Sequence, residues 1–161
     1  MLRADFRHGI VQLGEHGLTY DLLLYPRHLP VAVKLVQEFP DQRFVLDHIA
    51  KPLIADGVME PWKRDIQELA KFANVWCKVS GMVTEARWKQ WRAEDLRPYL
   101  DVVLGAFGPN RLMIGSDWPV CTLSAGYQET MGIVKDYIGQ LPIEQQEWVL
   151  GVNCTQFYGV E

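Results

Sequence analysis

The sequence has few cysteines and lacks the long apolar runs that membrane proteins need. Its three cysteines, Cys77, Cys121 and Cys154, stand too far apart for a disulfide framework or a C-x-x-C metal site. No run of 18 apolar residues occurs, so we expect no membrane span. Arg3 and Asp5 stand where a signal peptide has its apolar core, and we therefore expect a cytoplasmic protein.

Positive charge is also scarce. Sixteen Lys and Arg residues face 20 Asp and Glu residues, for a net charge of −4. Because nucleic-acid-binding surfaces are usually basic, we expect no nucleic-acid partner. The hydrophobic content of 48% and charged content of 22% exclude a disordered or fibrous chain. The 161 residues suit one domain, but they fall well short of the about 250 of a typical (β/α)8 barrel.

Four apolar segments predict the strands of a sheet. They cover residues 18–25, 43–48, 75–79 and 111–115. Helical periodicity follows each of them, over about 30–39, 61–73, 96–107 and 124–139, with a further helix from Pro142. Strictly alternating strands and helices predict an α/β fold of parallel βα units, without an internal domain boundary.

Polar residues gather where the predicted strands end. Ligands of parallel α/β folds bind at the carboxyl ends of the strands. The residues at these ends are Tyr25 and His28, then Asp47 and His48, then Lys78 and Ser80, and finally Ser116, Asp117 and Trp118. A carboxylate, an imidazole and an ammonium group at one edge of a sheet are suited to acid–base catalysis of a small-molecule reaction.

Strand alternation assigns some of these side chains to faces. His48 shares a face with Leu46 and is expected to point into the site. Asp47 is expected on the helix side, where burial demands a polar partner. Gly115 predicts a close approach to the backbone beside Asp117.

Each candidate residue also has a purely structural interpretation. Asp117 could form a turn, His48 could be a buried structural histidine, and Lys78 could reach from its strand to solvent. His28 could simply begin a helix, and the tryptophans could pack in the core or in loops. The functional interpretation therefore depends on their shared position at the strand ends.

Three longer segments resemble the amidohydrolase-2 family. They are FVLDHIAKP at 44–52, WCKVSGMVTEA at 76–86 and RLMIGSDWPVC at 111–121. The similarity is strongest to the sugar-lactonase branch, with its L-fuconolactonase-like and 2-pyrone-4,6-dicarboxylate-lactonase-like hydrolases. It implies that residues 1–161 form part of one amidohydrolase-2 domain, namely the carboxyl-terminal half (strands five to eight) of a (β/α)8 TIM barrel.

The same resemblance implies hydrolysis of a sugar lactone. Asp117 matches the aspartate that ends strand eight and acts as general base. His48 matches the histidine that ends strand six, which polarises the carbonyl or holds a metal. If a divalent metal such as zinc is used, His48 and Asp117 are its candidate ligands. The candidate substrate contacts are Lys78, Trp118, Tyr25 and His28.

One family feature has no counterpart here. The Asp-x-His-x-His stretch of strand one is absent, since His8 and His16 are too far apart to replace it. We therefore expect only half of an active site, inactive by itself. Its open sheet edges favour a homo-oligomer or pairing with a separate amino-terminal half. Two alternatives stay open: a non-catalytic half-barrel and a metal-dependent decarboxylase of the same family.

Overall fold

Four short parallel strands form the sheet at the centre of the protein. The computed structural model describes residues 1–160. The strands are β1 (Tyr20–Leu22), β2 (Phe44–Leu46), β3 (Val75–Val79) and β4 (Leu112–Ile114), and they lie side by side in chain order. Every neighbouring pair is parallel. The predicted α/β fold of successive βα units is confirmed.

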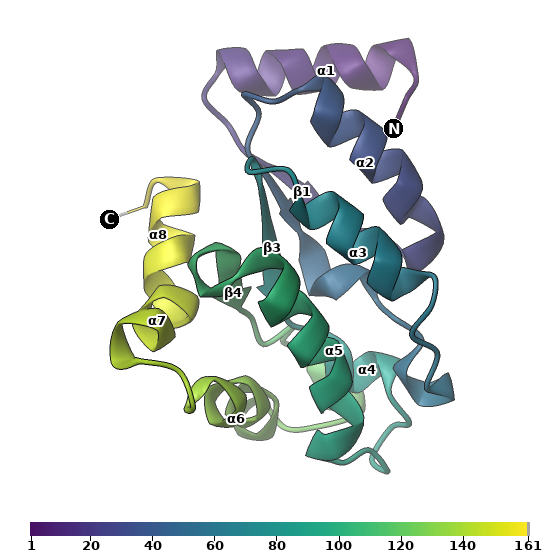
Figure 1. Ribbon diagram of the computed structural model, residues 1–161, viewed down its shortest axis with the longest axis vertical. Helices are drawn as coiled ribbons and strands as arrows, with labels where there is room; N and C mark the ends of the chain where they lie inside the picture. The colour runs from purple at the N-terminus through teal and green to yellow at the C-terminus, as the bar shows by residue number, and fades with distance from the viewer. Residues whose placement is uncertain (161) are drawn as a thin grey trace.

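Helices connect the strands and cover mainly one face of the sheet. The helices are α1 (Ala4–Glu15), α2 (Leu29–Glu38), α3 (Trp62–Ala70), α4 (Met82–Glu85), α5 (Ala93–Phe107), α6 (Tyr127–Ile138), α7 (Ile143–Glu147) and α8 (Asn153–Tyr158). Helices α2, α3 and α5 lie next to one another in front of the strands in Figure 1. None of the described helices is long and apolar enough to cross a membrane.

The main core lies between this helix layer and the sheet. Alternate strand residues such as Phe44, Leu46 and Cys77 are buried here. They meet the apolar stripes of the helices, such as Ile66 and Leu69 on α3. Burying each such side chain contributes about 1.5–3 kcal/mol, so this face accounts for most of the favourable burial.

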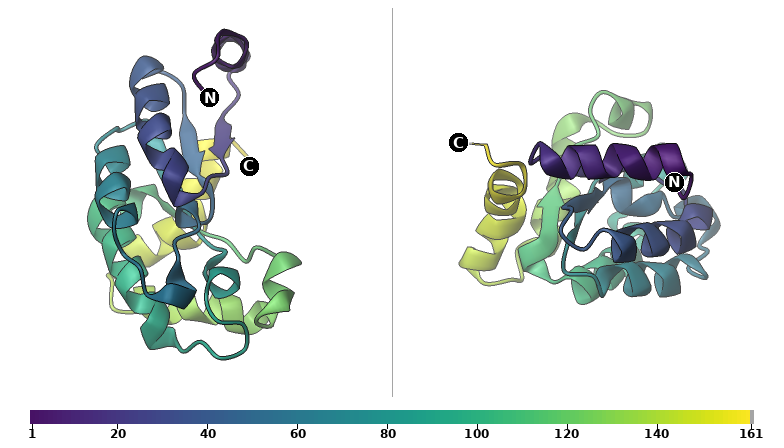
Figure 2. Two further views of the ribbon diagram at one scale, coloured as in Figure 1. Left: turned by 90° about the vertical axis from the view of Figure 1, so that its right-hand side faces the viewer. Right: turned by 90° about the horizontal axis from the view of Figure 1, so that it is seen from above.

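The opposite face of the sheet has a smaller apolar cluster. Val45 and Met113 pack there with Phe157 of α8. Asn153 fixes the start of this helix by donating hydrogen bonds to the carbonyl oxygens of Pro109 and Leu112, at 2.8 and 2.7 Å. Figure 2 shows the yellow carboxyl-terminal helix away from the layer that contains α2. Helix α8 therefore covers part of the face that α2, α3 and α5 leave open.

Three of the four strands are shorter than predicted, among them β4, which covers only Leu112–Ile114 of the predicted 111–115. The segment 18–25 contributes only Tyr20–Leu22, and Leu23 is 62% exposed, so the apolar run does not continue as a buried strand beyond Leu22. The segment 43–48 contributes only Phe44–Leu46, because the backbone turns into the left-handed region at His48. The third strand has the predicted bounds.

Candidate active site

The carboxyl ends of β2, β3 and β4 bring three polar side chains together. His48 follows β2, Ser80 follows β3, and Asp117 lies just beyond β4. His48 Nδ1 lies 2.8 Å from Ser80 Oγ, and His48 Nε2 lies 3.6 Å from Asp117 Oδ1. The structure thus places the two predicted catalytic residues side by side. Parallel strands produce this arrangement because their carboxyl ends meet at one edge.

The backbone after β2 directs His48 to this position. Residues 48–51 all have positive φ angles, of 51°, 46°, 60° and 50°. Residues other than glycine rarely adopt this region. Strand alternation therefore stops before His48, which reaches the site through the turn. Asp47 lies on the face opposite the helix layer, so the predicted helix-side position of Asp47 is wrong.

Asp117 presents one carboxylate oxygen to the site without a partner. Its Oδ2 atom is buried and accepts no hydrogen bond from any residue in the range 1–160. The side chain is only 11% exposed, and its backbone φ is 56°. A buried polar atom without a partner is costly. This oxygen is therefore available to a water molecule, a metal ion or a substrate.

The hydrogen-bonding roles around His48 follow from its two neighbours. An imidazole Nε2–H facing the Asp117 carboxylate is attracted to it, whereas an Nε2 lone pair is repelled. With the proton on Nε2, Nδ1 is an acceptor, and the Ser80 hydroxyl donates to it. Asp117 therefore favours the tautomer with the proton on Nε2, and the Ser80 hydroxyl, which can donate or accept, complements it.

Two glycines make room for this cluster. A Cβ atom on Gly81 would lie 2.8 Å from the Cβ of His48, and Gly81 has a φ of +65°. A Cβ atom on Gly115 would lie 3.0 Å from the Cβ of Ser80. The predicted close approach at Gly115 is confirmed, and Ser80 is the residue that approaches.

A second polar cluster lies on the open face of the sheet. The Lys78 ammonium group lies 2.5 Å from Asp21 Oδ2 and 2.8 Å from Asp47 Oδ1. Tyr158 of α8 donates its hydroxyl proton to the Asp21 carboxylate at 2.8 Å. We call these four residues the Lys78 cluster. Asp21 is the one charged residue in the largely apolar run 18–25, and this isolation is the signal that could have identified it.

The Lys78 cluster shifts the pKa values of its members. Burial disfavours the charged lysine, but hydrogen bonds to Asp21 and Asp47 outweigh this effect and raise the pKa of Lys78 above its ordinary value. Burial and the neighbouring Asp21 raise the pKa of Tyr158 to about 12. Any substrate contact made by Lys78 has to compete with two carboxylates.

The remaining predicted contact residues lie on the surface. Tyr25 is 50% exposed and Trp118 is 65% exposed. His28 Nδ1 accepts a hydrogen bond from the backbone N–H of Tyr25 at 3.2 Å. Across residues 1–160, neither hydrogen bonds nor ion pairs join these three side chains to His48 or Asp117. The structure therefore does not bring them into the central cluster.

The described residues do not hold a metal by themselves. A catalytic zinc site usually has three protein ligands. His48 and Asp117 supply two donors, and residues 1–160 contain no group of three His, Cys, Asp or Glu side chains placed to bind one ion.

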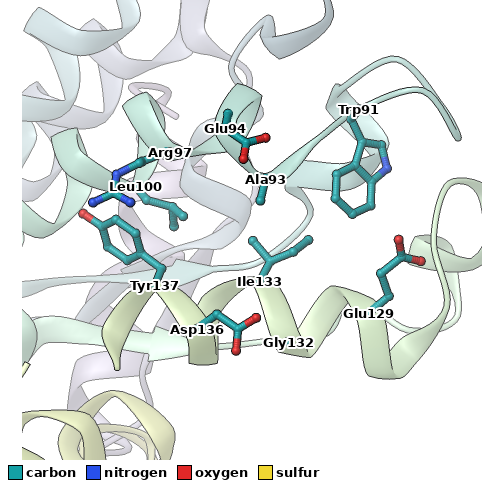
Figure 3. A pocket seen from close by; sticks show the side chains of 10 residues that line it. All are labelled: Trp91, Ala93, Glu94, Arg97, Leu100, Glu129, Gly132, Ile133, Asp136 and Tyr137. Carbon is teal, nitrogen blue, oxygen red and sulfur yellow. The ribbon is translucent and has the colours of Figure 1, made fainter. Parts of the chain in front are cut away.

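A cavity of about 450 Å³ lies elsewhere, between α5 and α6 (Figure 3). Apolar groups such as Trp91 and Ile133 line it together with the carboxylates of Glu94, Glu129 and Asp136. It contains none of the predicted site residues. The converging polar groups, rather than the size of a cavity, therefore identify the strand ends as the candidate site.

Comparison with known sequences shows the family of the chain. The profile of the amidohydrolase family matches residues 2–160. The L-fucono-1,5-lactonase of Burkholderia multivorans is 43% identical, over 98% of this chain and 56% of the relative. The L-fucono-1,5-lactonase of Burkholderia ambifaria is 39% identical, over 91% of this chain and 51% of the relative. The chain spans about half the length of the curated relatives that it matches.

Solved structures also superpose on the chain. A crystal structure of an amidohydrolase from Burkholderia multivorans with bound zinc superposes with a TM-score of 0.93 at 38% identity, over 99% of this chain and 58% of that one. A putative 2-pyrone-4,6-dicarboxylic acid hydrolase from Pseudomonas putida superposes with a TM-score of 0.79 at 23% identity, over 98% of this chain and 57% of that one, and supports the fold alone. The predicted family resemblance and the half-barrel architecture are confirmed.

Proposed function

The chain belongs to the amidohydrolase family, and we propose that it carries the carboxyl-terminal half of the active site of a sugar-lactone hydrolase. The observation that carries the proposal is the buried Asp117 carboxylate oxygen without a partner, next to an oriented imidazole. Support for the substrate class comes from the two L-fucono-1,5-lactonases that resemble the chain over nearly all of its length.

The proposed reaction uses these groups in order. Asp117 Oδ2 accepts a proton from a water molecule whose oxygen attacks the lactone carbonyl carbon. His48 Nε2 lies 3.6 Å from Asp117 Oδ1, too far for a hydrogen bond, and its N–H donates to the lactone oxygen on which negative charge develops. The bond between the acyl carbon and the ring oxygen then breaks. The leaving alkoxide takes the proton from Asp117, and an open-chain hydroxy acid results.

No step of this scheme passes through a metal ion, because the described residues supply only two donors. If zinc enters the site, a third ligand has to come from outside residues 1–160. Metal-dependent decarboxylation gains no support from the site geometry.

The experiment measures opening of L-fucono-1,5-lactone above its spontaneous rate. The chain is assayed alone and mixed with the amino-terminal segment of the Burkholderia multivorans lactonase that it does not match. We expect Asp117→Asn to lower the catalysed rate about 10²–10⁴-fold, since general-base catalysis contributes this much. Asp136→Asn, in the cavity of Figure 3, is the matched control and should keep the rate.

Two results contradict the proposal: a full rate in Asp117→Asn, or no catalysed opening in either form of the assay.

We also propose that the outer edges of β1 and β4 pair with another chain or segment. Each of these strands has only one strand neighbour within residues 1–160. Unpaired strand edges favour association. Analytical ultracentrifugation tests this. A stable monomer of 18.5 kDa, unchanged when the amino-terminal segment is added, contradicts the proposed pairing.

A further inference from the structure

We propose that Trp62 and Glu85 are positioning residues, which hold the left-handed turn His48–Lys51 in the conformation that aims His48 at Asp117. The inference depends on the proposed role of His48. It concerns the placement of the ring and not turnover, so it can fail or succeed independently of the lactonase proposal.

The turn needs such support because its own residues disfavour it. Four successive positive φ angles fall on His48, Ile49, Ala50 and Lys51, and none of these is a glycine. Ile49 is β-branched, which makes it especially unsuited to this backbone region. Left-handed residues normally occur singly. A run of four persists only where the surrounding structure over-determines it.

Trp62 anchors the middle of the turn. Its indole N–H donates a hydrogen bond to the carbonyl oxygen of Ile49 at 2.7 Å. The side chain is 2% exposed and packs on the ring of Tyr99, with 5.2 Å between ring centroids. Trp62 is the first residue of α3, so the donor is fixed to a helix that belongs to the main core. The Ile49 carbonyl thus has a rigid partner only while the turn keeps this shape.

Glu85 anchors the end of the turn. Its carboxylate lies 2.6 Å from the Lys51 ammonium group, and both side chains are about one-fifth exposed, at 20% and 19%. Glu85 ends α4, the helix that begins directly after Gly81, and Gly81 lies against His48. The backbone N–H of Lys51 also donates to the His48 carbonyl at 2.8 Å.

The two anchors act on the turn from separate helices. Neither Trp62 nor Glu85 donates to or accepts from the His48 ring. Loss of either anchor lets the turn relax towards right-handed or extended conformations, which all L-residues prefer. His48 would then leave the position between Ser80 and Asp117, and its ring nitrogens would lose their distinct partners.

The experiment uses the 161-residue chain labelled with ¹⁵N in its histidine rings, at one fixed pH. Ring ¹⁵N resonances separate the two neutral tautomers, and the spectrum of His48→Gln identifies the signals of His48 among the four histidines. In the parent chain we expect a single tautomer with its proton on Nε2. In Trp62→Phe and Glu85→Gln we expect the two ring signals to move towards the averaged positions of a free histidine.

Matched controls make the same chemical changes elsewhere. Trp88→Phe removes an indole that donates to the Thr84 carbonyl at 2.9 Å. Glu68→Gln removes a surface carboxylate that lies 2.6 Å from Lys71. Both should leave the His48 signals unchanged. Lys51→Arg, which keeps the ion pair, should also keep them, whereas Lys51→Gln should shift them.

Parental His48 signals in folded Glu85→Gln and Lys51→Gln overturn the role of the ion pair. Parental signals in Trp62→Phe overturn the role of the indole. If Trp62→Phe does not fold, the two variants of the partly exposed ion pair, Glu85→Gln and Lys51→Gln, decide the proposal. A shift in the control variants equal to that in the test variants also overturns it, because the effect would then be non-specific.

Discussion

The two polar clusters of the sheet differ in how completely their charges are paired. In the Lys78 cluster one ammonium group lies between two carboxylates, and a tyrosine hydroxyl completes the set. At the strand ends, His48 and Ser80 satisfy each other, but Asp117 Oδ2 has no partner among the described residues. The residues of the Lys78 cluster lie mainly in regular elements, namely β1, β3 and α8. The cluster at the strand ends depends on left-handed turns at His48 and Asp117.

This difference predicts which cluster contributes to stability and which to reactivity. In a charge-paired network such as the Lys78 cluster no charge is left free for a ligand, and removing one partner leaves the others uncompensated. An unpaired buried oxygen raises the energy of the folded state and gains most when a ligand arrives. Strain of this kind collects at functional sites. We therefore expect substitutions in the Lys78 cluster to change unfolding, and substitutions at the strand ends to change reactivity.

The largest stability effect is expected from Lys78→Met. It leaves Asp21 and Asp47 facing each other without a cation. Removing one partner of a buried pair costs about 3–5 kcal/mol, and partial exposure reduces this to about 2–3 kcal/mol here. The measurement is urea unfolding. Asp117→Asn is the comparison and should cost less than about 0.5 kcal/mol or stabilise, because it removes an unpaired buried charge. A smaller cost for Lys78→Met than for Asp117→Asn would break the distinction.

An effect of similar size is expected from Gly81→Ala. The new Cβ would meet His48 at 2.8 Å on a backbone with a φ of +65°. Gly57→Ala is the matched control, since Gly57 has a φ of +66° and nothing within 4 Å of the new atom. The control should lose only the about 1–2 kcal/mol of a left-handed alanine, and Gly81→Ala should lose about 1 kcal/mol more and displace the His48 ring signals. Equal losses in both variants would show that the site tolerates the extra atom.

The smallest effect is expected from Tyr158→Phe, and it depends on pH. A tyrosine whose folded pKa is about 12, above its ordinary 10, stabilises the fold fully below pH 10 and loses that stabilisation as the pH rises towards 12. Lys78, whose pKa is also raised, acts in the same direction at higher pH. Tyr158→Phe should cost about 1 kcal/mol at pH 8 and flatten the fall in unfolding free energy between pH 10 and 12. If the unfolding free energy of the variant falls as steeply between pH 10 and 12 as that of the parent chain, Tyr158 does not contribute to the cluster.

Sequence patterns predicted the alternation of strands and helices and placed His48 and Asp117 at the same edge of the sheet. Both follow from local periodicity and from one general property of parallel sheets. The left-handed turn could not be predicted, because no glycine or asparagine marks residues 48–51. The prediction placed Asp47 on the helix side because it took His48 to continue the strand alternation. The turn at His48 breaks that alternation.

The Lys78 cluster was missed for a different reason. Lys78 and Asp21 are 57 residues apart, and Tyr158 is 137 residues from Asp21. Only the register of the sheet, with Asp21 opposite Val45 and Val45 opposite Trp76, shows that these side chains share a face. Trp62 gave no functional signal, since its role depends on one backbone carbonyl in a turn that the sequence did not reveal.

The spacing of the site along the chain has a consequence for folding kinetics. His48 and Ser80 are 32 residues apart, and Asp117 comes from the next strand along the chain. Contacts of such high sequence separation form late, because a long stretch of chain must be ordered before they close. The His48–Ser80–Asp117 arrangement should therefore appear only after β2, β3 and β4 have docked in register. Its ring signals would then report a late step in assembly of the sheet, while contacts within single helices such as α5 report earlier ones.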